Sequence, residues 1–404
     1  MKKYTFKGGI YLNEETDNIR DKEIVKLFPG KELFYPIVGK VLVKEGERVL
    51  KGQMLSEASS VFDSVFSSVS GFVKSIKEIS DLHGEPQECI IIENDERYEL
   101  TNPYERVISK DINSSDTIEY VLFNLVESEP CFTSTYRLLL EQPKQLVQGM
   151  KELLSIYPNA KGIVGIEENH LECVHILQES IKDEPRIQMK VLKKKYPQYL
   201  KQPLIYALTK HKITYDMNPQ EKGCMIYNVN ELLFVQSLYV NKIPYTEQVI
   251  TLCGEGVNEP GNYSIHVGMT YCDVVEKAGG AKEGAYNWIS GGSMRGNTIL
   301  WQDAPVEKNC NGILALPYKQ EDILESHMCI RCGRCVEACP NKLMPCRLLT
   351  YAQIDKADKF MKWGGMECID CGCCSYVCPS KIDLKKYIYE MKVLIRSTKD
   401  ERAE

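Results

Sequence analysis

The fold of the last part of the chain is decided by the stretch Cys329-x2-Cys332-x2-Cys335-x3-Cys339-Pro340. The same spacing recurs as Cys368-x2-Cys371-x2-Cys374-x3-Cys378-Pro379. Two copies of this spacing in one chain are typical of proteins that carry two [4Fe–4S] clusters. Thiolate sulfur is the soft ligand that iron–sulfur clusters need, and a gap of two residues lets neighbouring sulfurs reach different irons. The stretch therefore predicts a two-cluster module.

The fourth cysteine of each motif, which precedes a proline, ligates the other cluster in two-cluster ferredoxins. We therefore predict two crossed ligand sets: Cys329, Cys332, Cys335 and Cys378 for the first cluster, and Cys368, Cys371, Cys374 and Cys339 for the second. Zinc and disulfides are the alternatives. Structural zinc usually takes separated pairs of ligands, and disulfides suit secreted chains, so the repeated spacing favours clusters.

The composition is that of an ordinary globular protein. The chain has 404 residues, of which 43% are hydrophobic and 26% charged, enough for about two to four domains. A net charge of −6 argues against a nucleic-acid partner. The start has no apolar secretory segment, and no apolar run reaches the length of a membrane span. With 17 cysteines, we expect a reducing, cytoplasmic location and cysteines that bind metal.

The nine cysteines outside the two ligand sets have no ligand spacing. We expect most of them to be buried as small apolar side chains, a common fate of free cysteine. Cys373 lies inside the second motif and Cys346 follows the first; we interpret both as bystanders, with a spare thiol near a cluster as the alternative. The histidines show no ligand spacing, so we assign them no catalytic or metal-binding role.

The part before the motifs changes its pattern twice. Residues 34–105 contain short runs of mixed polarity around glycine turns, which predicts a lipoyl-like barrel sandwich. The expected hairpin tip, Ala58 to Ser64, has no lysine to carry a cofactor, so we predict a scaffold role. Residues 117–240 alternate strands (118–126, 160–166, 187–192) with helices (142–156, 170–181), and 224–239 adds another strand and helix. This alternation predicts a Rossmann-like parallel α/β domain.

The remaining segment before the cysteines, residues 245–300, reads strand, strand, helix, which suggests a small β-grasp domain. We expect helices at 343–363 and 383–397 around the motifs. The predicted fold is thus multidomain α/β. Its domains are a barrel-sandwich domain with its N-terminal segment (1–105), the Rossmann-like domain (106–243), the β-grasp domain (244–318) and a helical two-cluster ferredoxin-like domain (319–404).

In this order the parts resemble the RnfC-like family, the C subunits of the Rnf electron-transport complex. The resemblance rests on these segments among others: Phe6-Lys7-Gly8-Gly9-Ile10, Asn124-x2-Glu127-x-Glu129-Pro130, Gly254-x-Gly256-Val257-x-Glu259-Pro260-Gly261-Asn262-Tyr263, Gly291-Gly292-x-Met294-x-Gly296 and the cysteine motifs. It implies an SLBB-like β-grasp domain and a middle domain similar to the NADH- and flavin-binding subunit of respiratory complex I. Such proteins pass electrons between NADH, FMN and clusters on the cytoplasmic side of a membrane complex.

The middle domain departs from the family at two places. Family members have a glycine-rich loop before the Asn-x2-Glu-x-Glu-Pro segment, whereas Val107 to Asp116 contains no glycine. The family's Tyr-Pro-Gln-Gly-Gly becomes Tyr196-Pro197-Gln198-Tyr199-Leu200. Glycines allow a backbone to approach a phosphate closely, so their loss predicts a degenerate site to which we expect neither FMN nor NADH to bind. Asn124, Glu127 and Glu129 remain candidate cofactor-binding residues, with a structural turn as the alternative.

The leading functional hypothesis is an iron–sulfur protein that relays single electrons between protein partners. One alternative is a working NADH-oxidising subunit that binds FMN, and another is a non-catalytic redox-sensing or interaction protein. The question of a dehydrogenase activity in this chain itself is left open. Arg331 and Arg334 suggest docking of an acidic carrier such as ferredoxin or flavodoxin. Other Rnf-like subunits are the further expected partners, with peripheral attachment to the inner face of the cell membrane.

Overall fold

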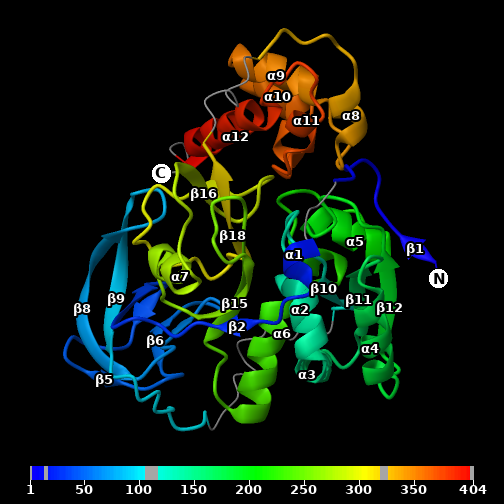
Figure 1. Ribbon diagram of the computed structural model, residues 1–404. Coiled ribbons are helices and arrows are strands. Elements are labelled where there is room, and N and C mark those ends of the chain that lie inside the picture. Colours follow the sequence, from blue (N-terminus) through cyan, green and yellow to red (C-terminus); the bar gives the residue numbers. More distant parts are fainter. Residues whose placement is uncertain (1, 13–16, 105–116, 319–325, 401–404) are drawn as a thin grey trace.

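The computed structural model describes residues 2–12, 17–104, 117–318 and 326–400 (Figure 1). It confirms the predicted fold class, with a barrel sandwich, a parallel α/β domain, a β-grasp sheet and a helical module at the carboxyl end. In Figure 1 this helical module (326–400, the cluster module) lies above the other domains. Val107 to Asp116, whose lack of glycine carries part of the prediction about FMN, lies outside the described residues.

The barrel sandwich consists of two small antiparallel sheets. One has the order β3-β9-β8-β5 and the other β4-β6-β7. Fully buried side chains such as Leu33, Tyr35 and Ile92 fill the space between them. The strands are β3 (Glu32–Pro36), β4 (Lys40–Val41), β5 (Arg48–Val49), β6 (Met54–Glu57), β7 (Val65–Phe66), β8 (Gly71–Ser80) and β9 (Pro86–Asn94).

The α/β domain has a five-stranded sheet in the order β1-β12-β11-β10-β13, and all of its pairings are parallel. Its strands are β1 (Lys3–Tyr4), β10 (Tyr120–Leu125), β11 (Lys161–Glu167), β12 (Ile187–Leu192) and β13 (Cys224–Asn228). Successive residues of a strand point to opposite faces, so Phe123 packs in one core and Leu122 in the other. Burial on both faces is characteristic of parallel sheets.

Helices cover both faces of this sheet. The predicted helices are found as α3 (Pro143–Ile156), α4 (Leu171–Ile181) and α6 (Val229–Gln236). Two helices that we did not predict, α2 (Ser134–Glu141) and α5 (Lys201–Thr209), complete the layers. Leu204 and Leu208 of α5 pack against Leu122 and Ile163 of the sheet. The bulky segment after Pro197 therefore fills one face of the sheet with a helix.

The β-grasp domain has a mixed sheet in the order β17-β16-β18-β14-β15-β2. The helix α7 (Tyr271–Lys277) begins at Thr270, whose hydroxyl accepts a hydrogen bond from Asp273 N (3.1 Å), and Gly279 follows it at φ +100°. The strands are β2 (Val25–Lys26), β14 (Glu247–Cys253), β15 (Gly261–His266), β16 (Tyr286–Ser290), β17 (Asn297–Thr298) and β18 (Gly312–Pro317).

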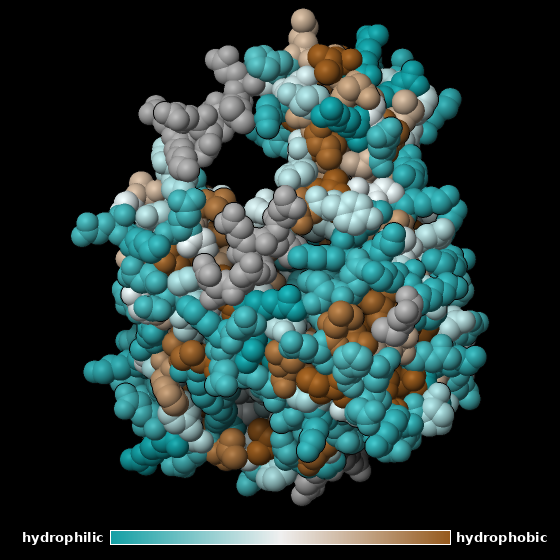
Figure 2. Space-filling model, turned by 45° about the vertical axis from the view of Figure 1, so that its right-hand side comes forward, coloured by the Kyte–Doolittle hydropathy of each residue, from teal (hydrophilic) through white to brown (hydrophobic). Residues whose placement is uncertain are grey.

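The cluster module is built from helices, as predicted: α8 (Arg334–Ala338), α9 (Pro345–Gln353), α10 (Ala357–Lys362), α11 (Cys373–Tyr376) and α12 (Leu384–Asp400). Leu348, Phe360 and Ile388 form the centre of its core. Hydrophilic residues cover most of the face seen in Figure 2, and apolar patches lie both on this module at the top and on the domains below it. No helix in the described ranges combines the length and the apolar composition needed to cross a bilayer.

The amino-terminal segment connects three domains. Its strand β1 extends the parallel sheet, Gly9 N donates to Ala338 O of the cluster module (2.8 Å), and β2 joins the β-grasp sheet. Figure 1 shows this blue segment entering between the cluster module and the α/β domain before it passes helix α1 (Asp17–Arg20). Strands β1 and β2 thus pair with sheets outside the barrel sandwich, although the prediction groups residues 1–105 in one domain. The domain boundary at residue 105 itself stays a prediction.

Candidate functional site

The cysteines of the two motifs line two separate cavities in the cluster module. The first cysteine cavity contains Cys329, Cys332, Cys335 and Cys378. The second cysteine cavity contains Cys339, Cys368, Cys371 and Cys374. In each cavity, three thiols come from one motif and the fourth comes from the other. The four cysteines of each cavity are those of one predicted ligand set. The binding of clusters by these thiols stays a prediction.

Both cavities arise from the same local backbone. Arg331 and Asp370, at equivalent positions of the two motifs, adopt left-handed conformations with φ of +58° and +53°. Each is followed two residues later by a glycine that also has positive φ (Gly333 +79°, Gly372 +77°) and begins a short helix. The left-handed turns curl the chain so that three cysteine side chains face one cavity.

The donor set fits iron–sulfur clusters better than single ions. Within the described ranges, no three histidine, cysteine, aspartate or glutamate side chains close around one metal ion. Four thiols spread around a cavity are the arrangement that a [4Fe–4S] cluster requires, because each sulfur binds a different iron. Burial raises the pKa of the Cys335 thiol to about 11, so a thiolate there depends on the positive charge of bound iron.

The two cavities differ in their exposure. Cys329 and Cys332 are exposed, and the neighbouring Met328 is 90% exposed. In the second cavity, Cys339, Cys371 and Cys374 are buried. A cluster in the first cavity would therefore lie at the surface, whereas one in the second would be enclosed by protein.

Each cavity has one additional thiol. Cys346, at the start of α9, lines the first, and Cys373 lines the second. Cys373 contacts Cys371, and Cys346 contacts Cys335. Their interpretation as bystanders stays a prediction. Of the seven scattered cysteines, five are buried as expected: Cys89, Cys173, Cys224, Cys253 and Cys310.

The second cysteine cavity has a buried cation beside it. Lys392 of α12 is 1% exposed, and its Nζ donates to Cys368 O and to Asp370 Oδ2, both at 2.6 Å. The same ammonium group lies 4.0 Å from the centre of the Tyr215 ring. These contacts fix the loop that carries Cys368 and Cys371 to helix α12.

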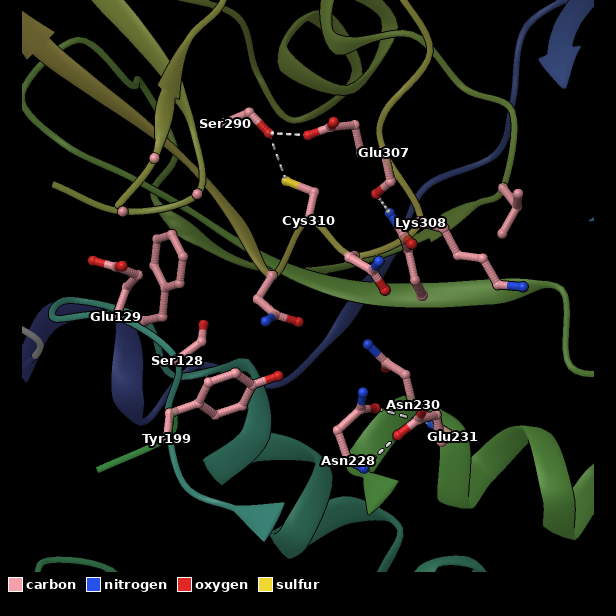
Figure 3. Close-up of a pocket in the computed structure, with 18 of the residues that line it drawn as sticks. Ser128, Glu129, Tyr199, Asn228, Asn230, Glu231, Ser290, Glu307, Lys308 and Cys310 are labelled. Atoms are coloured by element: carbon pink, nitrogen blue, oxygen red, sulfur yellow. Dashed lines mark hydrogen bonds between the residues drawn. The ribbon is translucent and has the colours of Figure 1, made fainter. Parts of the chain in front are cut away.

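A cavity of about 530 Å³, the central cavity, lies where the α/β and β-grasp domains meet (Figure 3). Ligands of parallel α/β domains bind at the carboxyl ends of the strands, and Asn228 and Asn230 line the cavity at the end of β13. The Oδ1 atom of Asn230 is buried without a hydrogen-bond partner. Figure 3 shows this cavity bordered by Asn228, Asn230 and Glu231 on one side and by Ser128, Glu129, Tyr199, Glu307, Lys308 and Cys310 on the others.

Of the three candidate cofactor-binding residues, only Glu129 lines the central cavity. Asn124 Nδ2 donates to Tyr199 O (3.0 Å), and Glu127 Oε1 accepts from Tyr136 N (2.8 Å) in the first turns of α2. Glu127 and Glu129 share a smaller neighbouring cavity. Asn124 and Glu127 thus make hydrogen bonds within the protein, which agrees with the alternative interpretation of this segment as a structural turn. A ligand-binding role for Asn124, Glu127 and Glu129 stays a prediction.

The central cavity is acidic. Among the described residues, five carboxylates line it, against the two cations Arg295 and Lys308; the carboxylates belong to Asp63, Glu129, Glu231, Glu247 and Glu307. Burial raises the pKa of Glu129 and of Glu231 to about 7. Near neutral pH these two carboxyls are therefore only partly ionised, and Glu247 is paired with Lys26 and Lys51, so the remaining negative charge opposes a phosphate group only in part. The sequence analysis missed Asn230 and Glu231, although polar residues directly after a buried strand were a usable signal.

Hydrogen bonds connect the central cavity to the second cysteine cavity. Tyr196 Oη donates to Cys371 O (2.8 Å). Glu129 Oε2 accepts from Met294 N (3.0 Å), and Lys385 Nζ of α12 donates to Met294 O (3.2 Å). The two sites are therefore adjacent, with the enclosed cysteine cavity facing the α/β and β-grasp domains.

Four family models match successive parts of the chain. They describe the RnfC barrel sandwich hybrid domain (residues 4–97), the Nuo51 FMN-binding domain (104–237), the SLBB domain (249–298) and a 4Fe-4S dicluster domain (328–382). The match to an FMN-binding domain means that the predicted absence of FMN is not confirmed. The dicluster match supports two clusters in the module that holds the cysteine cavities.

Curated relatives are similar along most of the chain. The C subunit of the Na(+)-translocating ferredoxin:NAD(+) oxidoreductase complex of Acetobacterium woodii is 28% identical over 399 residues, which cover 89% of this chain and 90% of the relative. The C subunit of the proton-translocating ferredoxin:NAD(+) oxidoreductase complex of Clostridium ljungdahlii is 26% identical, covering 87% and 85%. The C subunit of the ion-translocating oxidoreductase complex of Edwardsiella ictaluri is 30% identical, covering 90% and 50%.

Among solved structures, an NAD+-reducing [NiFe]-hydrogenase in the H2-reduced state matches with a TM-score of 0.47 and 16% identity over 69% of this chain and 57% of that one. The sequence relatives and the RnfC barrel-sandwich match confirm the resemblance to the RnfC-like family over nearly the whole chain.

Proposed function

We propose that this chain is an iron–sulfur electron-transfer subunit, related to the C subunit of the Rnf complex, which relays single electrons between protein partners. The observation that carries this proposal is the pair of cysteine cavities, each formed by three thiols of one motif and one of the other. When bound there, two [4Fe–4S] clusters supply one-electron chemistry. The crossed thiols hold the two clusters within one small module.

The exposed first cavity is the proposed contact with an electron carrier. Arg331 and Arg334 line it and are exposed, beside the apolar Met328 and Ile330. A cationic rim around an apolar patch favours an acidic partner, because opposite charges accelerate the encounter and align the two proteins. We propose ferredoxin or flavodoxin as the carrier, and other Rnf-like subunits as the complex to which this chain attaches at the cytoplasmic face of the membrane.

The enclosed second cavity is the proposed site of the cluster that lies away from the surface in the relay. Tyr196 and the segment around Met294 attach it to the α/β and β-grasp domains. These hydrogen bonds hold the second cysteine set beside the central cavity. The chain's own residues thus hold the path rigid, which is what one-electron transfer between fixed sites requires.

A working NADH-oxidising subunit is the second candidate. It is favoured by the match of residues 104–237 to an FMN-binding domain and by the location of the central cavity at the strand ends. Against it stand the acidic lining of that cavity and the absence of glycine from Val107 to Asp116. A redox-sensing or interaction protein, in which clusters only keep the module folded, is the third candidate.

The test is anaerobic purification followed by iron, sulfide and flavin analysis of one sample, and then addition of NADH in a spectrophotometer. About eight irons, no flavin and no bleaching by NADH would support a relay without its own dehydrogenase site. Stoichiometric FMN with bleaching by NADH would establish the second candidate. A protein that contains clusters but exchanges electrons with neither ferredoxin nor flavodoxin would favour the third.

A further inference from the structure

A second large cavity, of about 360 Å³, lies between the amino-terminal segment, helix α5 and the cluster module. We call it the basic cavity. Phe6, Pro203, Ile213 and Leu343 provide apolar walls. Its volume lies within the range of small-molecule sites, and it is separate from the central cavity, because the residues that line the two do not overlap.

One buried polar group in this cavity lacks a partner. Gln202, in the first turn of α5, is only 8% exposed, and its Nε2 atom is buried without a hydrogen bond. A buried N–H donor that stays unpaired costs about 1–3 kcal/mol. Because Gln202 lines the cavity, a turn of its amide toward an acceptor oxygen of a ligand there would remove this cost.

The charge of the basic cavity is opposite to that of the central cavity. Lys7, Lys212 and Lys342 line it, and none of the three forms a salt bridge with a carboxylate in the described part of the chain. Of the described residues that line it, one carries a carboxylate: Glu367, whose Oε2 accepts a hydrogen bond from Tyr215 N (2.8 Å). Three cations against one carboxylate attract an anion.

We propose that the basic cavity binds a small ligand with an apolar, ring-sized body that ends in a phosphate or a carboxylate. The body packs against the apolar walls, the anionic end lies among the three lysines, and an oxygen accepts from Gln202. Pro340 and Asn341, which directly follow Cys339 of the second set, form part of the lining. A bound anion therefore lowers the reduction potential of the second cluster; this consequence alone rests on the proposed function.

Isothermal titration of the cluster-loaded full chain with 1-naphthyl phosphate, 1-naphthoate and neutral 1-naphthol tests the proposal. We expect at least one of the two anions to bind at least tenfold more tightly than 1-naphthol, and the preferred anion identifies the ligand class. The pair Lys212→Glu and Lys342→Glu is expected to weaken that binding at least tenfold, and Gln202→Leu severalfold. Lys222→Glu, on an exposed lysine outside the cavity, should leave binding unchanged.

Equal binding of the anions and the neutral probe, or anion binding that survives the lysine pair, would overturn the proposal. So would the absence of saturable binding by any of the probes. As a second measurement, saturation with the preferred anion should lower the potential of the second cluster and leave that of the first unchanged. If anions bind but no cluster signal exists, the proposed function fails while the basic cavity stands.

Discussion

Replacing Lys392 with Met would leave Asp370 as a partly buried, unpaired negative charge beside the second cysteine cavity. The wild-type ammonium group is 1% exposed and donates at 2.6 Å to both Asp370 Oδ2 and Cys368 O. Removal of one partner of a buried pair costs about 3–5 kcal/mol. Because the Asp370 side chain retains 15% exposure, we take the lower end, about 3 kcal/mol. This raises local opening of the loop by about 150-fold.

Amide hydrogen exchange of residues 368–374, measured anaerobically by mass spectrometry on the cluster-loaded protein, reports this opening. We expect exchange to accelerate by about two orders of magnitude in Lys392→Met. The matched control is Lys386→Met, an exposed lysine on the same helix, which should exchange like the wild type. The double variant Lys392→Met with Asp370→Asn should recover most of the protection, because no unpaired charge remains. Protection in Lys392→Met equal to that of the control would refute the reasoning.

Three further predictions concern the same region. Cys378→Ser should remove the first cluster and Cys339→Ser the second, each halving the iron content, as resolved by paramagnetic resonance of the reduced protein. Gly8→Ala should speed the loss of the second cluster to an iron chelator, because a Cβ there would lie 2.3 Å from Cys339 O at a φ of +72°. Glu129→Gln should stabilise the protein more at pH 8 than at pH 5, by up to about 3 kcal/mol in the free energy of unfolding. Burial raises the pKa of Glu129 to about 7, so between about pH 4.5 and 7 the folded state holds a proton that the unfolded state releases, and stability falls as pH rises.

Each of these has an outcome that contradicts it. Loss of the cluster nearer in the sequence after Cys378→Ser would reject the crossed ligand sets. Unchanged chelation kinetics in Gly8→Ala, with Gly46→Ala as a control at a positive φ with open space around it, would show that the contact does not hold the module. For Glu129, an equal effect at both pH values would mean that the carboxyl ionises normally, and thermal unfolding at the two pH values measures this.

The sequence predicted those elements whose pattern is local. Strand β12 has the predicted bounds, and α4 differs by one residue at its start. The cysteine spacing also predicted which thiols share a cavity, because a ferredoxin-like loop permits few arrangements. Helix α5 was not predicted. Yet Leu204, Ile205 and Leu208 already had helical spacing.

Other features had no local signal. Strands β1 and β2 are two residues long each, and their pairing depends entirely on distant partners. The acidity of the central cavity likewise comes from residues of several domains, such as Asp63, Glu231 and Glu307, which are far apart in the sequence. Single motifs cannot reveal a property that only the packing of domains creates.

The amino-terminal segment has a consequence for biosynthesis. This segment leaves the ribosome before the residues that it contacts. Ala338, whose carbonyl oxygen accepts from Gly9 N, belongs to the cluster module, which is translated after the other three domains. Strands β1 and β2 can pair with β12 and β15 earlier, but the contact of Gly9 with the cluster module has to wait until that module has been translated. Insertion of iron and sulfide can thus precede the closing of this contact.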